Sequence, residues 1–263
     1  MIKLVAADLD GTLLDSKKQL SPNLPQILRR LSDKGIRFTP ASGRQYYNLI
    51  ELFPGLEHEL TFIAENGAIT VDRGETLFVD EIPPADLVRP LTLMRKVKGV
   101  YIVLAGEKSA YYADNDPVFY ENAHMYYTRL NHVPNLLDAA EKDRICKIAV
   151  FQKGGAEHGC YPLLQSCSDR FQVVLSGSDW VDLMNPGVSK GRAMRVLQHK
   201  LGITPDECMA FGDYLNDVEL LQSVTYSFAM ENAHPDLKAI SRSLAPSNDA
   251  DGVVRTLQAH LNL

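Results

Sequence analysis

The stretch that decides the fold is LVAADLDGTLLD, residues 4–15. The apolar run that opens it predicts a short buried strand, and the Gly-Thr pair behind the second aspartate ends that strand in a loop. Side chains two apart on a strand point the same way, so we expect Asp8 and Asp10 to project to one side of the strand tip. Two adjacent carboxylates repel each other, and a bound Mg²⁺ or a shared proton would offset that repulsion.

The residues that follow predict a strand–helix–strand unit. Ser21-Pro22 is typical of a helix start with Ser21 as the N-cap, and Gly35 ends the helical pattern. The stretch Ile36-Arg-Phe-Thr-Pro-Ala41 then predicts a second strand, which ends in Ser42-Gly43-Arg44. Two strands joined by one helix indicate a parallel sheet with a right-handed crossover.

The pattern of elements changes around Pro83-Pro84. From there to residue 185, helices are mixed with adjacent pairs of strands, which indicates an α+β insert with an antiparallel sheet. After Asn185-Pro186-Gly187 the α/β pattern resumes. We therefore predict an α/β core domain formed by residues 1–82 and 186–263 and an inserted α+β domain over residues 83–185.

A second acidic stretch follows the insert. The strand predicted at residues 207–211 ends in Gly212-Asp213, and Asn216-Asp217 comes directly after it. Ser189-Lys190-Gly191 opens the helix before that strand. In an open parallel sheet, ligands bind beyond the carboxyl ends of the strands. Several element ends that carry Asp, Ser and Lys therefore predict one convergent site.

The composition is that of an ordinary globular protein, with 45% hydrophobic and 23% charged residues among 263. A net charge of −6 and the lack of a basic cluster argue against nucleic acid as a partner. No apolar run approaches the roughly 18 residues that a membrane span requires, and aspartates interrupt the apolar stretch at the N-terminus. We therefore predict a cytoplasmic protein without a membrane partner; the sequence does not predict its oligomeric state.

The four cysteines, at positions 146, 160, 167 and 208, do not show the spacing of metal ligands. His158, Cys160 and Cys167 lie close enough in sequence to suggest a metal site. Reduced cysteines on an apolar helix face explain the same pattern more simply. We expect buried, reduced thiols.

Four stretches resemble, in order, the four sequence motifs of the haloacid dehalogenase (HAD) superfamily. They are DLDGTLLD at 8–15, Ser42-Gly43-Arg44, Ser189-Lys190-Gly191 and GDYLND at 212–217. Residues 229–234 and 248–252 resemble the Cof-type branch, and residues 41–50 with 64–67 resemble the sugar phosphatases of that branch. The resemblance implies a Rossmann-like, doubly wound core with an inserted α/β cap that selects the substrate.

The resemblance also implies an activity. It is that of a Mg²⁺-dependent phosphatase for small phosphorylated metabolites, sugar phosphates in particular, with an aspartyl-phosphate formed on Asp8. Asp8, the backbone carbonyl of Asp10 and the carboxylate of Asp213 would bind the Mg²⁺. Asp10 would protonate the leaving alcohol and then accept a proton from water, with a pKa raised by the neighbouring carboxylates.

Phosphate binding is implied for Ser42, for the N–H of Gly43 at a helix start, for Lys190 and for Asn216. Lys190 would otherwise be a solvated lysine, but helix N-termini disfavour cations, which favours a functional role.

Supporting roles are implied for Thr12, Arg44 and Asp217. Asp217 would support the metal waters or Lys190, or act only as a helix N-cap. Arg44 would serve the phosphate or merely pair at the surface. A role in a turn is sufficient to explain an asparagine at position 66, because Asn66 directly precedes Gly67.

Two other functions fit the same motifs. A phosphomutase would pass the phosphoryl group to a sugar hydroxyl instead of water. A non-catalytic sugar-phosphate sensor would be expected to lack Asp8, Asp10 or Lys190, and all three are present.

Overall fold

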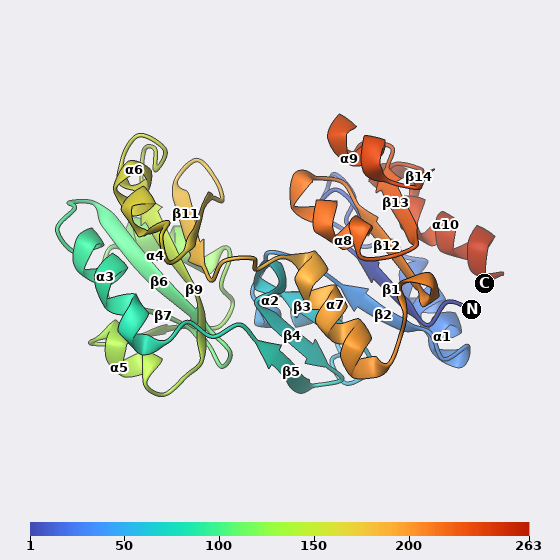
Figure 1. Ribbon diagram of the computed structural model, residues 1–263, viewed down its shortest axis with the longest axis horizontal. Helices are drawn as coiled ribbons and strands as arrows, with labels where there is room; N and C mark the ends of the chain where they lie inside the picture. The colour runs from blue at the N-terminus through green and yellow to red at the C-terminus, as the bar shows by residue number, and fades with distance from the viewer. Residues whose placement is uncertain (263) are drawn as a thin grey trace. The chain divides into compact units, whose positions relative to one another are not determined.

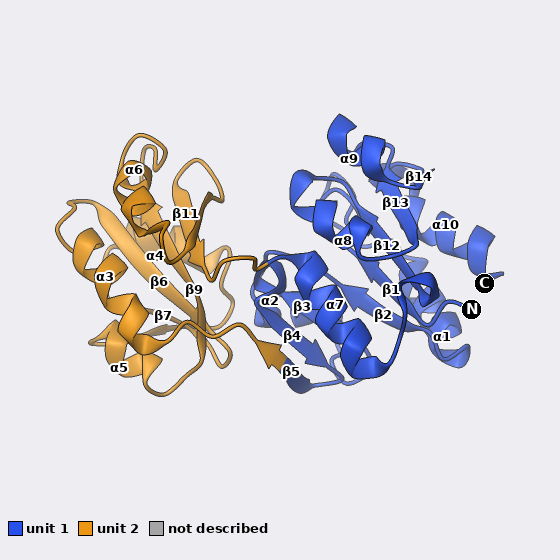
Figure 2. Ribbon diagram, in the orientation of Figure 1, with its two compact units in different colours: residues 1–77, 189–263 blue, residues 78–188 orange. Residues whose placement is uncertain are grey.

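The computed structural model describes residues 1–262, and this part of the chain forms two compact units (Figure 2). One unit comprises Met1–Leu77 and the chain from Ser189 onward, and the other is Phe78–Val188. The insert is therefore longer at both ends than the predicted 83–185. The side-chain amide of Asn185 donates to the carbonyl oxygen of Glu81 at 2.9 Å, so the outgoing and returning segments are joined to each other within the insert.

A parallel sheet forms the centre of the first unit, with the strand order β14-β13-β12-β1-β2 (Figure 1). The strands are β1 (Leu4–Ala7), β2 (Arg37–Pro40), β12 (Cys208–Gly212), β13 (Tyr226–Met230) and β14 (Ser243–Ala245). β1 is fully buried and pairs in parallel with β2 on one side and β12 on the other. The chain therefore builds the sheet from β1 in two directions, and the residues after β1 lie at the topological switch point.

The helices of the first unit alternate with the strands of this sheet along the chain. They are α1 (Leu24–Asp33), α2 (Tyr46–Leu52), α7 (Lys190–Leu201), α8 (Val218–Gln222), α9 (Pro235–Ile240) and α10 (Gly252–Leu261), with short 3₁₀ turns η3 (Pro205–Glu207), η4 (Leu215–Asp217) and η5 (Asn248–Ala250). α1 contacts α10, and α7 contacts α8. Strands and helices alternate as the sequence predicted, and the α/β class is confirmed.

The start of α1 differs from the prediction. The helix begins at Leu24, after Asn23, whereas Ser21-Pro22 predicts an earlier start. Pro25 occupies the first turn, where its missing N–H leaves no hydrogen bond unmade. Ser21 instead closes a turn, because its Oγ accepts from the backbone N–H of Asn23 at 3.2 Å.

A small second sheet extends the first unit. It contains β3 (Thr61–Ala64), β4 (Ile69–Asp72) and β5 (Glu75–Val79), and the 3₁₀ turn η1 (Glu65–Gly67) joins β3 to β4. An isolated parallel bridge between Ala41 and Ile63 connects β3 with the end of β2.

The inserted unit has its own sheet, with the strand order β10-β11-β9-β6-β7-β8. The strands are β6 (Val100–Gly106), β7 (Ala110–Tyr112), β8 (Leu130–His132), β9 (Ile145–Gln152), β10 (Gln172–Leu175) and β11 (Trp180–Met184). All neighbouring pairs are antiparallel except β7 and β8. The helices are α3 (Pro84–Met94), α4 (Pro117–His124), α5 (Leu136–Ala140), α6 (Cys160–Leu164) and the 3₁₀ turn η2 (Gln165–Cys167).

Both faces of the central strand β9 are buried. Ile148 and Val150 of β9 belong to one apolar cluster, and the alternate residues Ala149 and Phe151 belong to another. The sequence of residues 126–130 is strand-like and predicts a strand there. That strand does not form, because Tyr127 is buried in the second cluster and strand pairing begins at Leu130. Nowhere in residues 1–262 does a helix combine the length and apolarity needed to cross a membrane.

Candidate active site

Three neighbouring strands of the core sheet end at one edge. Asp8 follows β1, Ser42 lies shortly after β2, and Asp213 follows β12. The register continues past β1, because the N–H of Asp8 donates to the carbonyl oxygen of Phe211 at 3.1 Å. The carboxyl ends of parallel strands meet at the same edge, so these residues come together although they are far apart in sequence.

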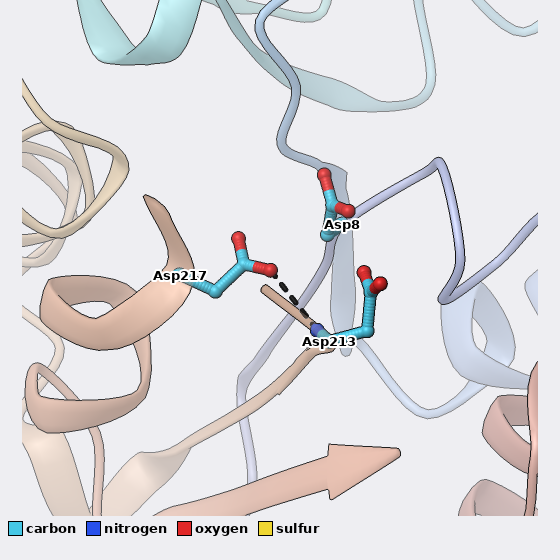
Figure 3. Close-up of side chains that lie close together, drawn as sticks. All are labelled: Asp8, Asp213 and Asp217. Carbon is cyan, nitrogen blue, oxygen red and sulfur yellow. Dashed lines mark hydrogen bonds between the residues drawn. The ribbon is translucent and has the colours of Figure 1, made fainter. Parts of the chain in front are cut away.

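Asp8, Asp213 and Asp217 form an acidic cluster (Figure 3). One oxygen of each carboxylate lies within 4.8 Å of the others. Burial raises the pKa of Asp8 well above its usual value, the charge of Asp217 raises it further, and Lys190 opposes both. Burial and the charge of Asp217 likewise raise the pKa of Asp213. Nearby positive charge would therefore stabilise the ionised form of these carboxylates.

Lys190 supplies one such charge. It is the first residue of α7 and is only 1% exposed, so a solvated lysine at a helix start is the wrong interpretation. Its Nζ donates to Oδ1 of Asp8 at 2.6 Å and to Oδ1 of Asp217 at 2.7 Å. Burial alone would lower the pKa of Lys190, but the two carboxylates outweigh burial and raise it. The lysine therefore stays charged inside the site.

Asp217 is held from both sides. Its Oδ1 binds Lys190, and its Oδ2 accepts the backbone N–H of Asp213 at 3.0 Å, the bond drawn in Figure 3. Of its predicted roles, the structure shows the contact with Lys190. Asp217 also occupies the N-cap position of α8, but its side chain makes no capping hydrogen bond to that helix.

Thr12 and Gly11 fix the position of Asp213. The buried hydroxyl of Thr12 donates to Oδ1 of Asp213 at 3.0 Å. Gly11 has φ of +81°, and a Cβ at this position would lie 2.3 Å from Oδ2 of Asp213. The position therefore requires glycine both for its backbone conformation and for the close approach of the carboxylate.

The donor set suits a hard divalent cation. The cluster offers carboxylate oxygens alone, with no sulfur or imidazole. The pKa values of Asp8 and Asp213 are raised, and nearby positive charge would lower them. Asp217 already binds Lys190 and a backbone N–H, so Asp8 and Asp213 are the carboxylates best placed to bind Mg²⁺.

Asp10 does not join the cluster, and the prediction that its pKa is raised by neighbouring carboxylates is wrong. β1 ends at Ala7, so the alternation of a strand no longer applies at Asp10. Its carboxylate accepts from Nε and Nη2 of Arg44 at 3.0 and 2.8 Å and from Nζ of Lys18 at 2.8 Å. Burial alone would raise the pKa of Asp10, but the hydrogen bonds and charges of these two cations lower it instead. Its neighbours are cations where carboxylates were expected.

Ser42 lies in a tight loop beside the cluster. It is buried, and its Oγ accepts the backbone N–H of Arg44 at 3.2 Å. Gly43 is not at a helix start as predicted, because α2 begins only at Tyr46. Any help that the N–H of Gly43 gives to an anion therefore comes from the loop and not from a helix.

Asn216 lies at the surface and contacts Asn66. It is exposed, and its Nδ2 donates to Oδ1 of Asn66 at 3.5 Å. The structure thus brings together Asp8, Asp213, Asp217, Lys190 and Thr12, whereas Asp10 pairs with Arg44 and Asn216 meets Asn66.

Comparison with known proteins decides the family. The family model for haloacid dehalogenase-like hydrolases matches residues 5–257. This chain belongs to that family. The HAD-like hydrolase is 34% identical to the 5-amino-6-(5-phospho-D-ribitylamino)uracil phosphatase YbjI of Escherichia coli K12, over 96% of this chain and 94% of the relative.

A second relative of this HAD-like hydrolase is also named as a phosphatase, and a solved structure shares its fold. The HMP-PP phosphatase of Cronobacter sakazakii is 29% identical over 91% of this chain and 88% of its own length. The crystal structure of SMU.1108c from Streptococcus mutans UA159 is 30% identical, covers all of both chains and superposes with a TM-score of 0.84. The chain is therefore a hydrolase of phosphate esters with a HAD core and an inserted cap, as its motifs predicted.

Sequence reasoning missed two contributors to the HAD site. Lys18 binds Asp10 from a loop position with φ of +61°, which no local pattern indicates. Asn232 donates from Nδ2 to the carbonyl oxygen of Gly11 at 2.8 Å and so ties a distant loop to the first motif. The resemblance of residues 229–234 to the Cof-type branch was the available signal for Asn232.

The cysteines are buried and free, as predicted. Cys160 and Cys167 belong to an apolar cluster of the inserted unit. Within the described residues, the acidic cluster of Asp8, Asp213 and Asp217 is the one group with metal-ligand geometry, so the structure favours packing over a metal site at His158.

Proposed function

We propose that the chain is a Mg²⁺-dependent phosphatase that hydrolyses small phosphorylated metabolites, with sugar phosphates as its substrate class. The observation that carries the proposal is the carboxylate of Asp8, which is 6% exposed and bound by a buried lysine at 2.6 Å. An anionic nucleophile can approach a phosphate dianion only where fixed cations offset the repulsion between them. Lys190 is such a cation.

The reaction proceeds in two displacements. An oxygen of Asp8 attacks phosphorus, an acyl-phosphate bond forms, and the bond from phosphorus to the alcohol oxygen breaks. Asp10 gives its proton to the leaving oxygen. Water then attacks the same phosphorus and loses a proton to Asp10, the bond to Asp8 breaks, and inorganic phosphate leaves.

Asp10 must first lose its cation partners. Arg44 and Lys18 favour its ionised form and would oppose protonation. An incoming phosphate dianion offers both cations another partner, so substrate binding itself would free Asp10 for proton transfer.

The carboxylates of Asp8 and Asp213 and the backbone carbonyl of Asp10 would hold the Mg²⁺. Bound there, Mg²⁺ would neutralise charge on the phosphate and on the attacking carboxylate. Asp217 keeps Lys190 in place, while Ser42 and Asn216 would bind phosphate oxygens.

The sequence resemblance and the name of the E. coli relative support sugar phosphates as the substrate class. The E. coli relative is named for a substrate with a phosphorylated ribityl chain, and the C. sakazakii relative is named for HMP-PP. The proposed role of the insert is to select among such leaving groups.

A substrate panel tests the proposal. Sugar phosphates, 5-amino-6-(5-phospho-D-ribitylamino)uracil and HMP-PP are offered with Mg²⁺ and with a chelator, to wild type and to Asp8→Asn. We expect phosphate release that requires both the metal and Asp8, with sugar phosphates as the best substrates. Release that survives both chelation and Asp8→Asn would refute the mechanism.

The same panel separates the phosphatase from a phosphomutase. A phosphatase releases inorganic phosphate without a sugar bisphosphate activator, whereas a phosphomutase requires the activator and forms an isomeric sugar phosphate. A sensor binds sugar phosphates and releases no phosphate.

A further inference from the structure

The turn Glu65–Gly67 lies beside the candidate site with three successive residues at positive φ, and the proposed mechanism does not use it. Its three residues have φ of +50°, +55° and +102° in succession. Glutamate rarely adopts positive φ, and consecutive residues of this kind persist only where the surroundings impose them. Two backbone bonds do so here: the N–H of Glu65 donates to Arg44 O at 3.0 Å, and the N–H of Asn66 donates to Ser42 O at 3.0 Å.

The turn also packs against the start of α7. A Cβ on Gly67 would lie 2.2 Å from the carbonyl oxygen of Ser189. Ser189 directly precedes Lys190, so the turn lies in contact with the backbone that presents this lysine. The turn Glu65–Gly67 is therefore held in place both by the Ser42–Arg44 loop and by the start of α7.

The side chain of Asn66 lies between two of the proposed phosphate-binding residues. A Cβ built on Gly43 would lie 3.0 Å from both Oδ1 and Nδ2 of Asn66, so the amide rests directly on the phosphate loop. On its other side, Oδ1 accepts from Nδ2 of Asn216 at 3.5 Å. Asn66 is partly exposed.

We propose that Asn66 is a positioning residue, whose amide holds Asn216 and the Ser42–Gly43 loop at the spacing that a phosphate group requires. The inference rests on the proposed function, because that function makes Asn216 and Ser42–Gly43 the phosphate binders. A simpler explanation is that asparagine stands at this position only because it tolerates positive φ.

The substitution Asn66→Gly separates the two explanations. Glycine adopts a φ of +55° at least as readily as asparagine, so the turn keeps its shape and loses only the amide. Asn262→Gly is the matched control, because Asn262 has φ of +50° at the end of α10, outside the candidate site. The readouts are kcat and KM for p-nitrophenyl phosphate with Mg²⁺, the Kd of inorganic phosphate by calorimetry, and the melting temperature.

For Asn66→Gly we expect the Kd of inorganic phosphate and the KM to rise about tenfold, with an unchanged melting temperature. Asn262→Gly should match wild type in both constants. Gly43→Ala gives an independent measurement, because its new methyl group would press on the Asn66 amide in wild type and meet no amide in Asn66→Gly. The Gly43→Ala change should therefore raise KM in the wild-type background and have little effect in the Asn66→Gly background.

A double-mutant cycle with Asn216→Ala tests whether Asn66 acts through Asn216. If it does, adding Asn66→Gly to Asn216→Ala raises Kd far less than it does in wild type. Wild-type affinity in Asn66→Gly, or fully additive losses in the cycle, would overturn the inference and leave the phosphatase proposal standing. A wild-type enzyme that hydrolyses no phosphate ester would instead overturn the proposed function, and the phosphate Kd would still test Asn66.

Discussion

The Nζ atom of Lys190 lies 2.6 Å from Asp8 and 2.7 Å from Asp217, and all three side chains are buried. Removing one partner from a buried ion pair leaves a charge that neither water nor protein compensates. We therefore predict that Lys190→Met lowers the free energy of unfolding by about 3–5 kcal/mol in metal-free buffer. Urea unfolding measures this effect.

The substitution Asp217→Asn, added to Lys190→Met, provides the matched comparison. Lys190→Met/Asp217→Asn removes one positive and one negative charge together, so it should recover part of the lost stability. Equal unfolding free energies for Lys190→Met and wild type would show that the lysine does not compensate the carboxylates.

Asp10→Asn tests the proton transfer at the level of a single group. The amide keeps the size of the carboxylate and the backbone carbonyl proposed as a metal ligand, but it cannot donate or accept the required proton. We predict that kcat falls by about 10²–10⁴-fold while the Kd for Mg²⁺ changes little. Turnover at the wild-type rate would remove Asp10 from the proton-transfer role.

Sequence reasoning predicted three of the residues that the structure brings together. Asp8, Asp213 and Lys190 were predictable because carboxylates and a lysine at element ends point to charge chemistry. The pKa direction of Asp10 was not, because it depends on Arg44 and Lys18. Lys18 itself has a left-handed backbone conformation, and its contact with Asp10 exists only in the folded loop.

At the scale of elements, the N-cap of α7 directly precedes Lys190, the buried lysine of the candidate site. Ser189 is this N-cap, and its Oγ accepts the backbone N–H of Arg192 at 3.1 Å. We predict that Ser189→Ala lowers the free energy of unfolding by about 1 kcal/mol and that Ser189→Thr restores most of it. Chemical denaturation of the three proteins measures the difference, and an alanine variant as stable as wild type would show that the cap contributes nothing.

The cysteines give a prediction for buried elements in both units. Burial raises the pKa of Cys160, in α6, and of Cys208, in β12, to about 11. Since the thiolate is the reactive form, only about 10⁻³ of each thiol is ionised at pH 8. Native protein should therefore react slowly with a thiol reagent at pH 8, and all four thiols should react in denaturant; rapid labelling of the native protein would contradict their burial.

Element prediction succeeded where one local signal dominated. Pro117, an apolar run and Gly252 predict a helix at residues 117–124, a strand at 226–230 and a helix at 252–261. The elements α4, β13 and α10 have these bounds. The strand predicted at residues 126–130 failed because burial of Tyr127 against the sheet depends on residues distant in sequence. The parallel pairing of β7 and β8 is likewise a tertiary choice that neither strand encodes alone.

At the scale of the whole molecule, every residue assigned to phosphate, metal or proton transfer lies in the first unit. The insert adds two apolar clusters and contributes none of these residues. Its existence was predictable from the change in element pattern, but its limits were not, because the amide of Asn185 that joins the two linking segments leaves no local pattern. The proposed division of labour is chemistry in the core and selection in the insert.

Trapping the phosphorylated enzyme tests the central claim most directly. Enzyme with Mg²⁺ is mixed with a sugar phosphate carrying radioactive phosphorus and quenched in acid within one turnover. Asp8 as nucleophile predicts protein-bound label on the peptide that contains residues 4–15, and none in Asp8→Asn. Hydrolysis at the full rate without label on wild type, or label that persists in Asp8→Asn, would contradict the account.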